Sequence, residues 1–466
     1  MESSLSLGSN LMESPELANS THKAPFQTPT MDSRGKRIVL AAGLRLPQVK
    51  AGGAYGEEDA GHLGASAARE LLARTGIDPA ELDEVIVGCV GPPHDQANIG
   101  RVVGLRAGVP RSVPGYTVGR NCASGMQSVT EAATRIHAGN GDLFLCVGAE
   151  AMSAYPLHFN QRATRFFGKL AGARSIGARL GAITSWRPAM LAPRIALIEG
   201  LTDPTNGMIM GKTAERLVRD FGITREEVDA FALESHNRAR TARDAGRFAR
   251  EIAPHMPLGK RGAKGSLVHD DGIRDNQSMT ALGRMRPYFD KPDGVVTVGN
   301  ACGISDGATA LLITTQERAE SLGLTPLAGI RSWAWSGCDP ARMGLGPVYS
   351  TSEALQHAGC ELDDMGVIEI NEAFAAQVIA CRRAFASDEF AQKHLGRDHA
   401  LGHVSPEKMN KNGGAIALGH PVGATGARLL LTVAHELEVS DCELGLATLC
   451  IGGGQGGAVV LERIAA

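Results

Sequence analysis

The sequence contains few aromatic residues, has no strong charge of one sign, and includes no long apolar run. Aromatic residues make up 4% of the 466 residues, and the formal net charge is −3. Few rings are available for base stacking, and a balanced charge gives little attraction to a polyanion. No apolar run approaches the roughly 18 to 20 residues needed to cross a bilayer. We therefore expect a soluble protein that binds no nucleic acid.

Cysteine is present without the patterns of a disulfide framework or a metal site. The nine cysteines are odd in number, and none belongs to a C-x-x-C pair or a Cys/His cluster at zinc spacing. This favours a reducing compartment and predicts no metal site. Residues 1–33 contain no arginine and no apolar core, so they resemble neither a transit peptide nor a secretory signal. We interpret them as a disordered tail of a cytoplasmic protein.

Apolar runs alternate with amphipathic segments from Lys36 onward, which is typical of an α/β fold. In the first half, strands are predicted at 37–43, 83–91 and 142–152, and helices at 62–76 and 122–139. The second half repeats this order, with a strand and helix within 364–386, a helix within 419–437 and two strands within 444–462. The pattern predicts two related halves, each with helices on the faces of a sheet.

A different region separates the two halves. Thr224 and Glu227 have the spacing of a capping box and predict a helix over 224–246. Residues 158–196 carry seven basic side chains and no acidic one: Arg162, Arg165, Lys169, Arg174, Arg179, Arg187 and Arg194. This stretch is either a solvated face or a contact for anionic lipid, a partner subunit or the phosphates of a ligand.

Two glycine-rich motifs suggest other functions. Residues 452–457 match G-x-G-x-x-G, but a strand-like segment follows where a dinucleotide site needs a helix. Residues 303–307 match the G-x-S-x-G nucleophile elbow and follow a strand-like stretch at 294–301. A serine hydrolase using Ser305 is therefore an alternative, although the β-branched residues after the motif do not favour the required helix.

Three chain-distant residues are candidates for covalent chemistry. Cys122 comes at the start of a predicted helix, where the helix dipole lowers a thiol pKa towards neutrality. His420 lies in a glycine-lined turn, and Cys450 ends an apolar strand that opens into a glycine loop able to hold an oxyanion. If the halves stack with pseudo-symmetry, these three loops meet in one pocket.

Five segments give the sequence a family resemblance. "NCASGMQSV", "GNACGISDGA", "NEAFAAQ", "GGAIALGHPVGATGAR" and "LCIGGGQGGA" occur in the order and spacing of the thiolase family, and the resemblance covers residues 37–462. It implies two pseudo-symmetric βαβαβαββ halves in a five-layer αβαβα arrangement, plus an inserted loop domain. The expected units are 34–155 for the N-terminal half, 156–283 for the insertion, 284–312 for a return segment and 313–466 for the C-terminal half.

The resemblance also implies catalytic roles. Cys122 would be the nucleophile that becomes acylated, His420 would take its proton, and Cys450 would be the second acid and base. Asn371 would orient a water at one oxyanion site, and the backbone N–H groups of Cys122 and Gly452 would form another.

Residues that would contact the substrate follow from the same likeness. Arg274 would contact the adenine end of coenzyme A, and Ala373 and Phe374 the pantetheine tunnel. Met210 would form the wall of the acyl pocket. Cys302 stands at a pantetheine contact where the family often has serine.

The implied function is CoA-dependent thiolytic cleavage of 3-ketoacyl-CoA in fatty acid β-oxidation. Coenzyme A would be a co-substrate, with no permanently bound cofactor. We expect a homodimer or tetramer. The insertion is closest to that of the β-subunit of trifunctional complexes, which would allow an α-subunit as a partner. Residues 158–196 would allow a peripheral contact with a membrane. The alternatives are a biosynthetic acetyl-CoA C-acetyltransferase, a decarboxylating condensing enzyme, the hydrolase using Ser305, and an inactive scaffold subunit.

Overall fold

The computed structural model describes residues 35–259 and 265–464, so the predicted tail lies outside the described residues. Ten of its strands form one sheet in the order β10-β11-β12-β9-β1-β8-β5-β3-β4, with β2 beside β8. The N-terminal half supplies β1 (Ile38–Arg45), β2 (Val49–Lys50), β3 (Glu84–Gly88), β4 (Gly115–Val118), β5 (Leu143–Ala151) and β8 (Ser305–Thr315). The C-terminal half supplies β9 (Ala328–Gly337), β10 (Val367–Ile370), β11 (Leu444–Ile451) and β12 (Gln455–Glu462).

The two halves of the sheet have matching topology. Strand β3 is parallel to β5, β5 is antiparallel to β8, and β8 is antiparallel to β1. In the other half β10 is parallel to β11, β11 is antiparallel to β12, and β12 is antiparallel to β9. Only a short pairing of β1 with β9, at Val39 and Leu40, joins the two halves. The predicted pseudo-symmetry is therefore confirmed.

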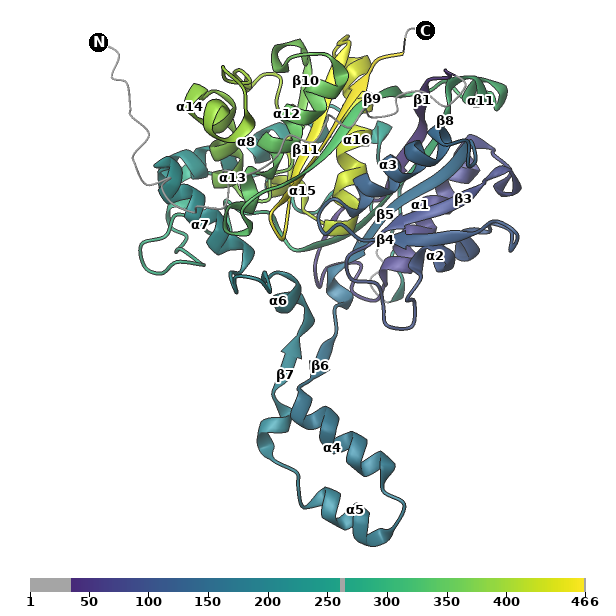
Figure 1. Cartoon of the computed structure of the whole chain (residues 1–466), viewed down its shortest axis with the longest axis vertical. Helices are drawn as coiled ribbons and strands as arrows, with labels where there is room; N and C mark the ends of the chain where they lie inside the picture. Colours follow the sequence, from purple (N-terminus) through teal and green to yellow (C-terminus); the bar gives the residue numbers. More distant parts are fainter. Residues whose placement is uncertain (1–34, 260–264, 465–466) are drawn as a thin grey trace.

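Helices cover the two half-sheets in layers (Figure 1). Helices α1 (Ala60–Thr75) and α2 (Ile99–Ala107) pack on the outer face of the N-terminal half, and α12 (Gly346–Ala358) and α13 (Ala375–Phe385) on that of the C-terminal half. Helices α3 (Ser124–His137) and α16 (Val422–Val439) share a core with both half-sheets. Because α16 is sandwiched, every residue from Val422 to Leu437 is buried. The five-layer arrangement is confirmed.

Small residues let the two central helices approach closely. A Cβ atom added to Gly125 on α3 would lie 2.7 Å from the Gly423 carbonyl oxygen. One added to Gly426 on α16 would lie 2.6 Å from the Met126 backbone nitrogen. Glycine is therefore required at both positions, and the close contact brings the starts of α3 and α16 together.

The insertion leaves the body of the molecule as a two-stranded ribbon and returns to it through three helices (Figure 1). Strands β6 (Leu157–Phe159) and β7 (Pro193–Ile195) pair and carry α4 (Gln161–Gly172) and α5 (Ile176–Ile183) at their far end. The chain then forms α6 (Ala196–Gly200), α7 (Met210–Phe221) and α8 (Arg225–Asp244), and α7 and α8 pack on the C-terminal half. The capping box of Thr224 and Glu227 is present, as predicted.

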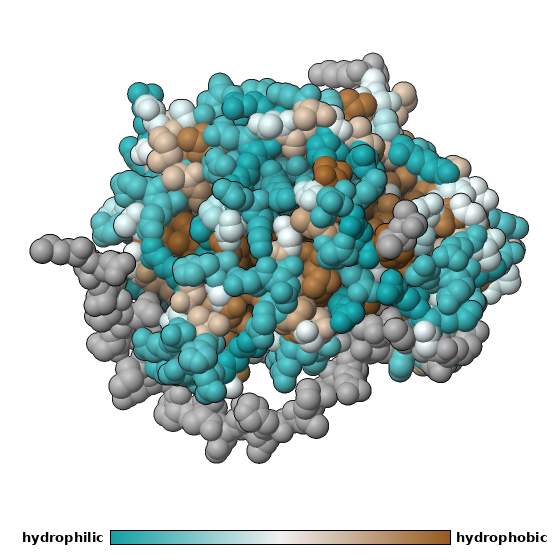
Figure 2. Space-filling model, turned by 90° about the horizontal axis from the view of Figure 1, so that it is seen from above, coloured by the Kyte–Doolittle hydropathy of each residue, from teal (hydrophilic) through white to brown (hydrophobic). Residues whose placement is uncertain are grey.

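The remaining helices are short. They are α10 (Met279–Gly283), α11 (Gln316–Ser321), α14 (Asp388–Phe390) and α15 (Ala415–Leu418), with single turns at 79–81, 152–154, 188–191, 247–250, 340–345, 362–364 and 391–395. Strand β8 continues past the expected boundary at residue 312. Among the described residues no helix combines the length and apolarity that crossing a bilayer requires. Seen from above, hydrophilic residues cover most of the surface, with small apolar areas between them (Figure 2).

The strand expected at 294–301 is wrong. This segment is a loop, because the backbone N–H groups of Val295 and Val296 donate to the Glu215 carboxylate, at 3.0 and 2.8 Å from Oε1, instead of to a neighbouring strand. Val296 and Thr297 are buried while Val298 is exposed, so the stretch has the β-branched composition of a strand without the pairing of one.

Candidate active site

Cys122 lies in a tight turn between β4 and α3. The helix begins at Ser124, not at Cys122 as the sequence predicted. The preceding Asn121 has a φ of +43°, a left-handed conformation that is uncommon outside glycine and is often found at functional sites. The Asn121 Nδ2 donates to the Gly452 carbonyl at 2.7 Å, and the Asn121 carbonyl accepts a hydrogen bond from the Ser124 hydroxyl at 2.8 Å. These bonds hold the cysteine turn against the glycine loop after β11.

The Cys122 thiol has a raised pKa, contrary to the prediction of a lowered one. Burial is the largest cause, and the negative charge of Glu150 adds to it. Hydrogen bonds from the backbone N–H groups of Gly452 and Cys122 act in the opposite direction but do not outweigh burial. The thiol is therefore protonated near neutral pH and needs a base before it can attack a carbonyl.

His420 has the geometry of such a base. Its Nδ1 lies 2.6 Å from the Thr425 hydroxyl, which itself donates to the Pro421 carbonyl at 3.0 Å. Because the Thr425 hydroxyl donates its proton to the Pro421 carbonyl, the Thr425 oxygen accepts a hydrogen bond from His420 Nδ1. The histidine proton is therefore on Nδ1, and Nε2 is an acceptor. Burial, assisted by the Arg428 charge, lowers the pKa of His420 to about 3. The imidazole is therefore neutral, and Nε2 can accept a proton.

Two further thiols lie near Cys122. Burial raises the pKa of Cys450 well above its usual value, and the charges of Cys122, Cys381 and Cys302 raise it further. The pKa of Cys302 is raised to about 12, again by burial first and then by the Cys122 charge. These mutual effects place Cys122, Cys302 and Cys450 in one electrostatic neighbourhood. His420 adjoins it, because its backbone N–H donates to the carbonyl of Gly303, the residue after Cys302.

Asn371 faces the histidine from the end of β10. Its Nδ2 lies 3.5 Å from His420 Nε2, and its backbone N–H donates to the Thr448 carbonyl at 3.0 Å. The side chain is buried, and its Oδ1 accepts no hydrogen bond from the described residues. A buried acceptor of this kind requires a partner, so the amide is suited to holding a water or a substrate group.

The site opens to solvent through three loops. Asn121, Gly303 and Gly453 are exposed, while Cys450 and His420 behind them are buried. Gly453 and Gly454 have φ values of +91° and +77°, so the loop after β11 needs glycine at both positions.

The predicted substrate residues are divided between this site and its surroundings. A Cβ atom added to Gly452 would lie 3.4 Å from Met210 Sδ, so Met210 borders the glycine loop. Ala373 and Phe374 are buried after Asn371, and the Ala373 carbonyl accepts the Cys302 N–H at 3.1 Å. Arg274 lies on an exposed loop, where its described contact is to His236 on α8, its N–H donating to Nδ1 at 3.3 Å.

The hydrolase alternative does not fit the structure. Ser305 is the first residue of β8, and this strand continues to Thr315, so no helix follows the G-x-S-x-G motif. The Ser305 hydroxyl donates to the Gly303 carbonyl at 3.3 Å, and a Cβ atom added to Gly419 would lie 2.7 Å from it. The motif is a packing surface for the histidine loop and does not have the geometry of a nucleophile elbow.

Glu150 is a positioning residue that sequence reasoning missed. It is fully buried and accepts hydrogen bonds from the N–H groups of Val90, Gly91 and Gly423, each at 3.0 Å, and from the Tyr155 hydroxyl at 3.0 Å. Gly423 belongs to the first turn of α16, so one carboxylate joins the His420 side of the site to the N-terminal half. The only available signal was a single acidic residue within a buried strand.

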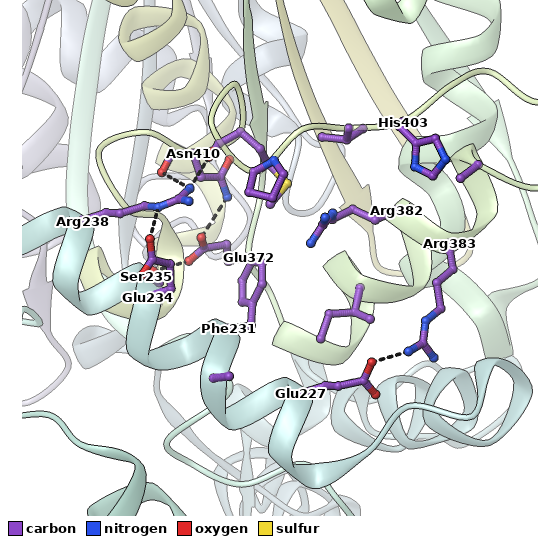
Figure 3. A pocket seen from close by; sticks show the side chains of 16 residues that line it. Glu227, Phe231, Glu234, Ser235, Arg238, Glu372, Arg382, Arg383, His403 and Asn410 are labelled. Atoms are coloured by element: carbon purple, nitrogen blue, oxygen red, sulfur yellow. Dashed lines mark hydrogen bonds and ion pairs between the residues drawn. The ribbon is translucent and has the colours of Figure 1, made fainter. Parts of the chain in front are cut away.

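A pocket of about 530 Å³ between α8 and α13 is lined by none of the cysteines (Figure 3). It is lined by Glu372, which accepts from Ser235 Oγ at 2.6 Å and from Asn410 Nδ2 at 2.8 Å. Glu372 also accepts the Ile416 N–H at 3.2 Å, so it fixes the chain on both sides of the site, next to Asn371 and before His420. Glu372 therefore stabilises the loops of the candidate active site from the wall of this pocket.

Two sequence models match nearly all of the chain: the thiolase N-terminal domain over residues 38–317 and the thiolase C-terminal domain over residues 324–463. A probable acetyl-CoA acyltransferase of Staphylococcus aureus strain N315 is 39% identical over 427 residues, 92% of this chain and 99% of its own. A 3-ketoacyl-CoA thiolase of Pectobacterium carotovorum is 38% identical over 436 residues, 93% of this chain and 98% of its own.

Solved structures agree with these matches. The crystal structure of the Bacillus anthracis acetyl-CoA acetyltransferase superposes with a TM-score of 0.80 at 35% identity and covers 92% of this chain and 99% of that one. The human mitochondrial 3-ketoacyl-CoA thiolase in complex with CoA superposes with a TM-score of 0.78 at 34% identity, covering 92% and 98%.

Proposed function

Because the chain belongs to the thiolase family of acyltransferases, we propose that it cleaves 3-ketoacyl-CoA with coenzyme A to give acetyl-CoA and a shortened acyl-CoA. The observation that carries this proposal is the neutral His420, with Nε2 free to accept a proton, beside a cluster that contains Cys122 and Cys450. The cycle needs CoA as a co-substrate and no resident cofactor.

In the first half-reaction, His420 Nε2 takes the Cys122 proton and the thiolate attacks the 3-keto carbon. The N–H groups of Cys122 and Gly452, which already bond the sulfur region, would stabilise one developing oxyanion. The tetrahedral intermediate collapses by breaking the C2–C3 bond, which leaves an acyl group on Cys122 and the enolate of acetyl-CoA. Cys450 protonates this enolate at C2, while His420 and Asn371 stabilise its oxygen.

In the second half-reaction, the thiol of a new CoA loses its proton to Cys450 and attacks the Cys122 thioester. The shortened acyl-CoA leaves, and the Cys122 thiolate takes back its proton from His420 Nε2. A thioester intermediate keeps the acyl group activated, so no ATP is consumed.

The proposal is tested by following acetyl-CoA formation from 3-ketohexadecanoyl-CoA and CoA. We expect wild-type turnover and none above background for Cys122→Ala, with Cys360→Ala as a matched control outside the cluster. Full turnover by Cys122→Ala would contradict the assignment of Cys122 as the nucleophile. Turnover of acetoacetyl-CoA as a second substrate measures the chain-length preference. We propose that the enzyme prefers medium or long chains and acts in fatty acid β-oxidation.

The biosynthetic direction remains a second candidate, because a structural neighbour is an acetyl-CoA acetyltransferase. The same residues run the reaction in reverse, with Cys450 removing the methyl proton of acetyl-CoA. Acetoacetyl-CoA formed from acetyl-CoA alone, faster than long-chain cleavage at equal enzyme concentration, would favour this direction.

The outer insertion supports a proposal about partners. Large apolar side chains are exposed along it, at Leu157, Phe159, Phe167, Ile176, Leu180, Ile183, Trp186 and Leu191, among the basic residues of 158–196. Apolar and basic groups together suit an anionic lipid surface. Co-sedimentation with anionic but not zwitterionic vesicles, lost on replacing Ile176 and Leu180 with Ser, is the expected result. Binding to neither vesicle would exclude lipid and leave a further copy or an α-subunit as the partner.

A further inference from the structure

Two histidines and a glutamate form a cluster in the N-terminal half that the proposed reaction does not use. Glu58 lies directly before Asp59, the capping residue of α1, and His62 lies in the first turn of that helix. His255 comes from a segment after α8. One nitrogen or oxygen atom from each of the three side chains lies within 4.8 Å of the other two.

The distances in this cluster are those of a nearly formed metal site. His255 Nε2 lies 3.0 Å from Glu58 Oε2, and His62 Nε2 lies 3.7 Å from the same oxygen. Ligands of a tetrahedral zinc ion, with bonds of about 2.0 to 2.1 Å, are separated by roughly 3.3 Å. The separations of Glu58 Oε2 from the two imidazole nitrogens bracket that value, and the third separation in the cluster is at most 4.8 Å, so the two histidines would move closer together on binding an ion.

Glu58 is a buried carboxylate with no lysine or arginine partner among the described residues. Its side chain is fully buried. One oxygen accepts the Leu258 N–H at 3.0 Å, and both face the imidazole of His255. In the part of the chain that the structure describes, no lysine or arginine forms an ion pair with it. A divalent cation bound by all three side chains would balance the charge of this buried carboxylate.

The ligands are held in place by their surroundings. The backbone of His255 exchanges two hydrogen bonds with Leu267, at 3.0 and 2.8 Å, and its ring meets the buried Tyr55 ring edge-on, with centroids 5.4 Å apart. The His62 N–H donates to the Asp59 carboxylate at 2.7 Å. The side chain of His62 is one-third exposed, which leaves an entry path and room for a water ligand.

We propose that Glu58, His62 and His255 bind one divalent transition-metal ion of the zinc class, with water in the fourth position. Two imidazoles and one carboxylate form a known zinc ligand set and suit Co²⁺ as well. The ion links the start of α1 to the backbone pairing of His255 with Leu267, which is far from α1 in sequence. Its role is to stabilise this contact, so it has no part in the acyl transfer.

The test measures Zn²⁺ binding to the full chain by equilibrium dialysis and metal analysis. We expect one equivalent in the wild type that is lost in His62→Gln and His255→Gln, with affinity at least about tenfold weaker in each. His158→Gln is the matched control, because His158 stacks on His94 at 5.1 Å without a carboxylate. Saturating Zn²⁺ should also raise the unfolding midpoint by about 2 to 5 °C in the wild type and the control only.

The free cysteines are the competing ligands. A Cys122→Ser variant therefore joins the series, and Co²⁺ replaces Zn²⁺ in a parallel absorption measurement. Retention of the metal by Cys122→Ser, with no thiolate-to-cobalt charge-transfer band, supports the proposal. Equal zinc content in the wild type, His62→Gln and His255→Gln, or loss of all metal in Cys122→Ser, would overturn it. Because His62 is partly exposed, its variant tests the site even if His255→Gln fails to fold.

Discussion

The two halves of the molecule use equivalent positions for different chemistry. Cys122 lies two residues before α3, and His420 lies two residues before α16, the matching helix of the other half. Glu150 is the second-last residue of β5, and Cys450 is the second-last residue of the matching strand β11. The N-terminal half thus supplies the proposed nucleophile and a structural carboxylate, and the C-terminal half supplies the proposed base and the proposed second acid and base. Pseudo-symmetry brings these groups together, but the side chains decide their roles.

The largest expected effect comes from removing the base. His420→Ala should lower kcat for 3-ketoacyl-CoA cleavage by about 10³- to 10⁴-fold, because the Cys122 thiol has a raised pKa and His420 is the neutral base proposed to take its proton. Steady-state kinetics measure the loss. Alkylation of Cys122 by iodoacetamide near pH 7 should slow in parallel. Unchanged alkylation would mean that the thiol ionises without His420.

The second prediction distinguishes the roles of Cys450 and Glu150, which occupy equivalent positions on β11 and β5. Cys450→Ser should lower kcat by about 10²- to 10⁴-fold with little loss of stability, since the thiol acts on a proton. Glu150→Gln should instead destabilise the fold, because an amide has one acceptor oxygen where the carboxylate accepts from Val90, Gly91 and Gly423. We expect a loss of about 2 to 3 kcal/mol in urea unfolding. The reverse pattern would contradict the assigned roles.

A smaller effect is expected from the residue that sets the histidine tautomer. Thr425→Val removes the oxygen that accepts the His420 Nδ1 proton and should lower kcat by about 10- to 100-fold, while Thr425→Ser should restore it. Nitrogen NMR of labelled histidine provides the second readout, with the proton on Nδ1 in the wild type. A purely structural role would leave the tautomer unchanged in Thr425→Val.

The close approach of the central helices gives a fourth prediction. Gly426→Ala places a Cβ atom 2.6 Å from the Met126 nitrogen and should reduce the free energy of unfolding by about 1 to 3 kcal/mol. Gly168→Ala on α4 is the control, because its Cβ atom would meet nothing within 4 Å. Equal stability of the two variants would show that α3 and α16 do not meet at these glycines.

The last prediction concerns pH. The folded pKa of His420, about 3, lies below its ordinary 6.5, so the unfolded chain binds the proton more readily. Stability from this group is complete above pH 6.5 and falls as pH drops towards 3. His420→Gln should therefore lose less unfolding free energy than the wild type between pH 6.5 and 4. Equal losses of unfolding free energy in the two proteins would mean that His420 lies in a more polar environment than the structure shows.

The sequence predicted the repeated strand and helix order, the start of α8 and the loops that carry Cys122, His420 and Cys450. These features depend on local patterns that one segment contains. It did not predict the raised pKa of Cys122, because burial depends on distant residues packed around the thiol. The loop at 294–301 was missed because Glu215, far away in the chain, takes the hydrogen bonds of a strand.

The cluster of Glu58, His62 and His255 escaped sequence analysis for a similar reason. Two of its members are four residues apart, but the third comes from the far end of the insertion. Spacing rules recognise metal sites only when most ligands lie in one segment. A fold that returns to the N-terminal half through a long insertion can form such a site without a motif.

One measurement tests the central claim most directly. The wild type is mixed with 3-ketohexadecanoyl-CoA without free CoA, and the intact mass and released acetyl-CoA are recorded at early times. We predict one tetradecanoyl group per chain, located on Cys122 by peptide mass analysis, and one acetyl-CoA released for each group bound. Acetyl-CoA release without an acylated chain, or acylation of a residue other than Cys122, would contradict the account.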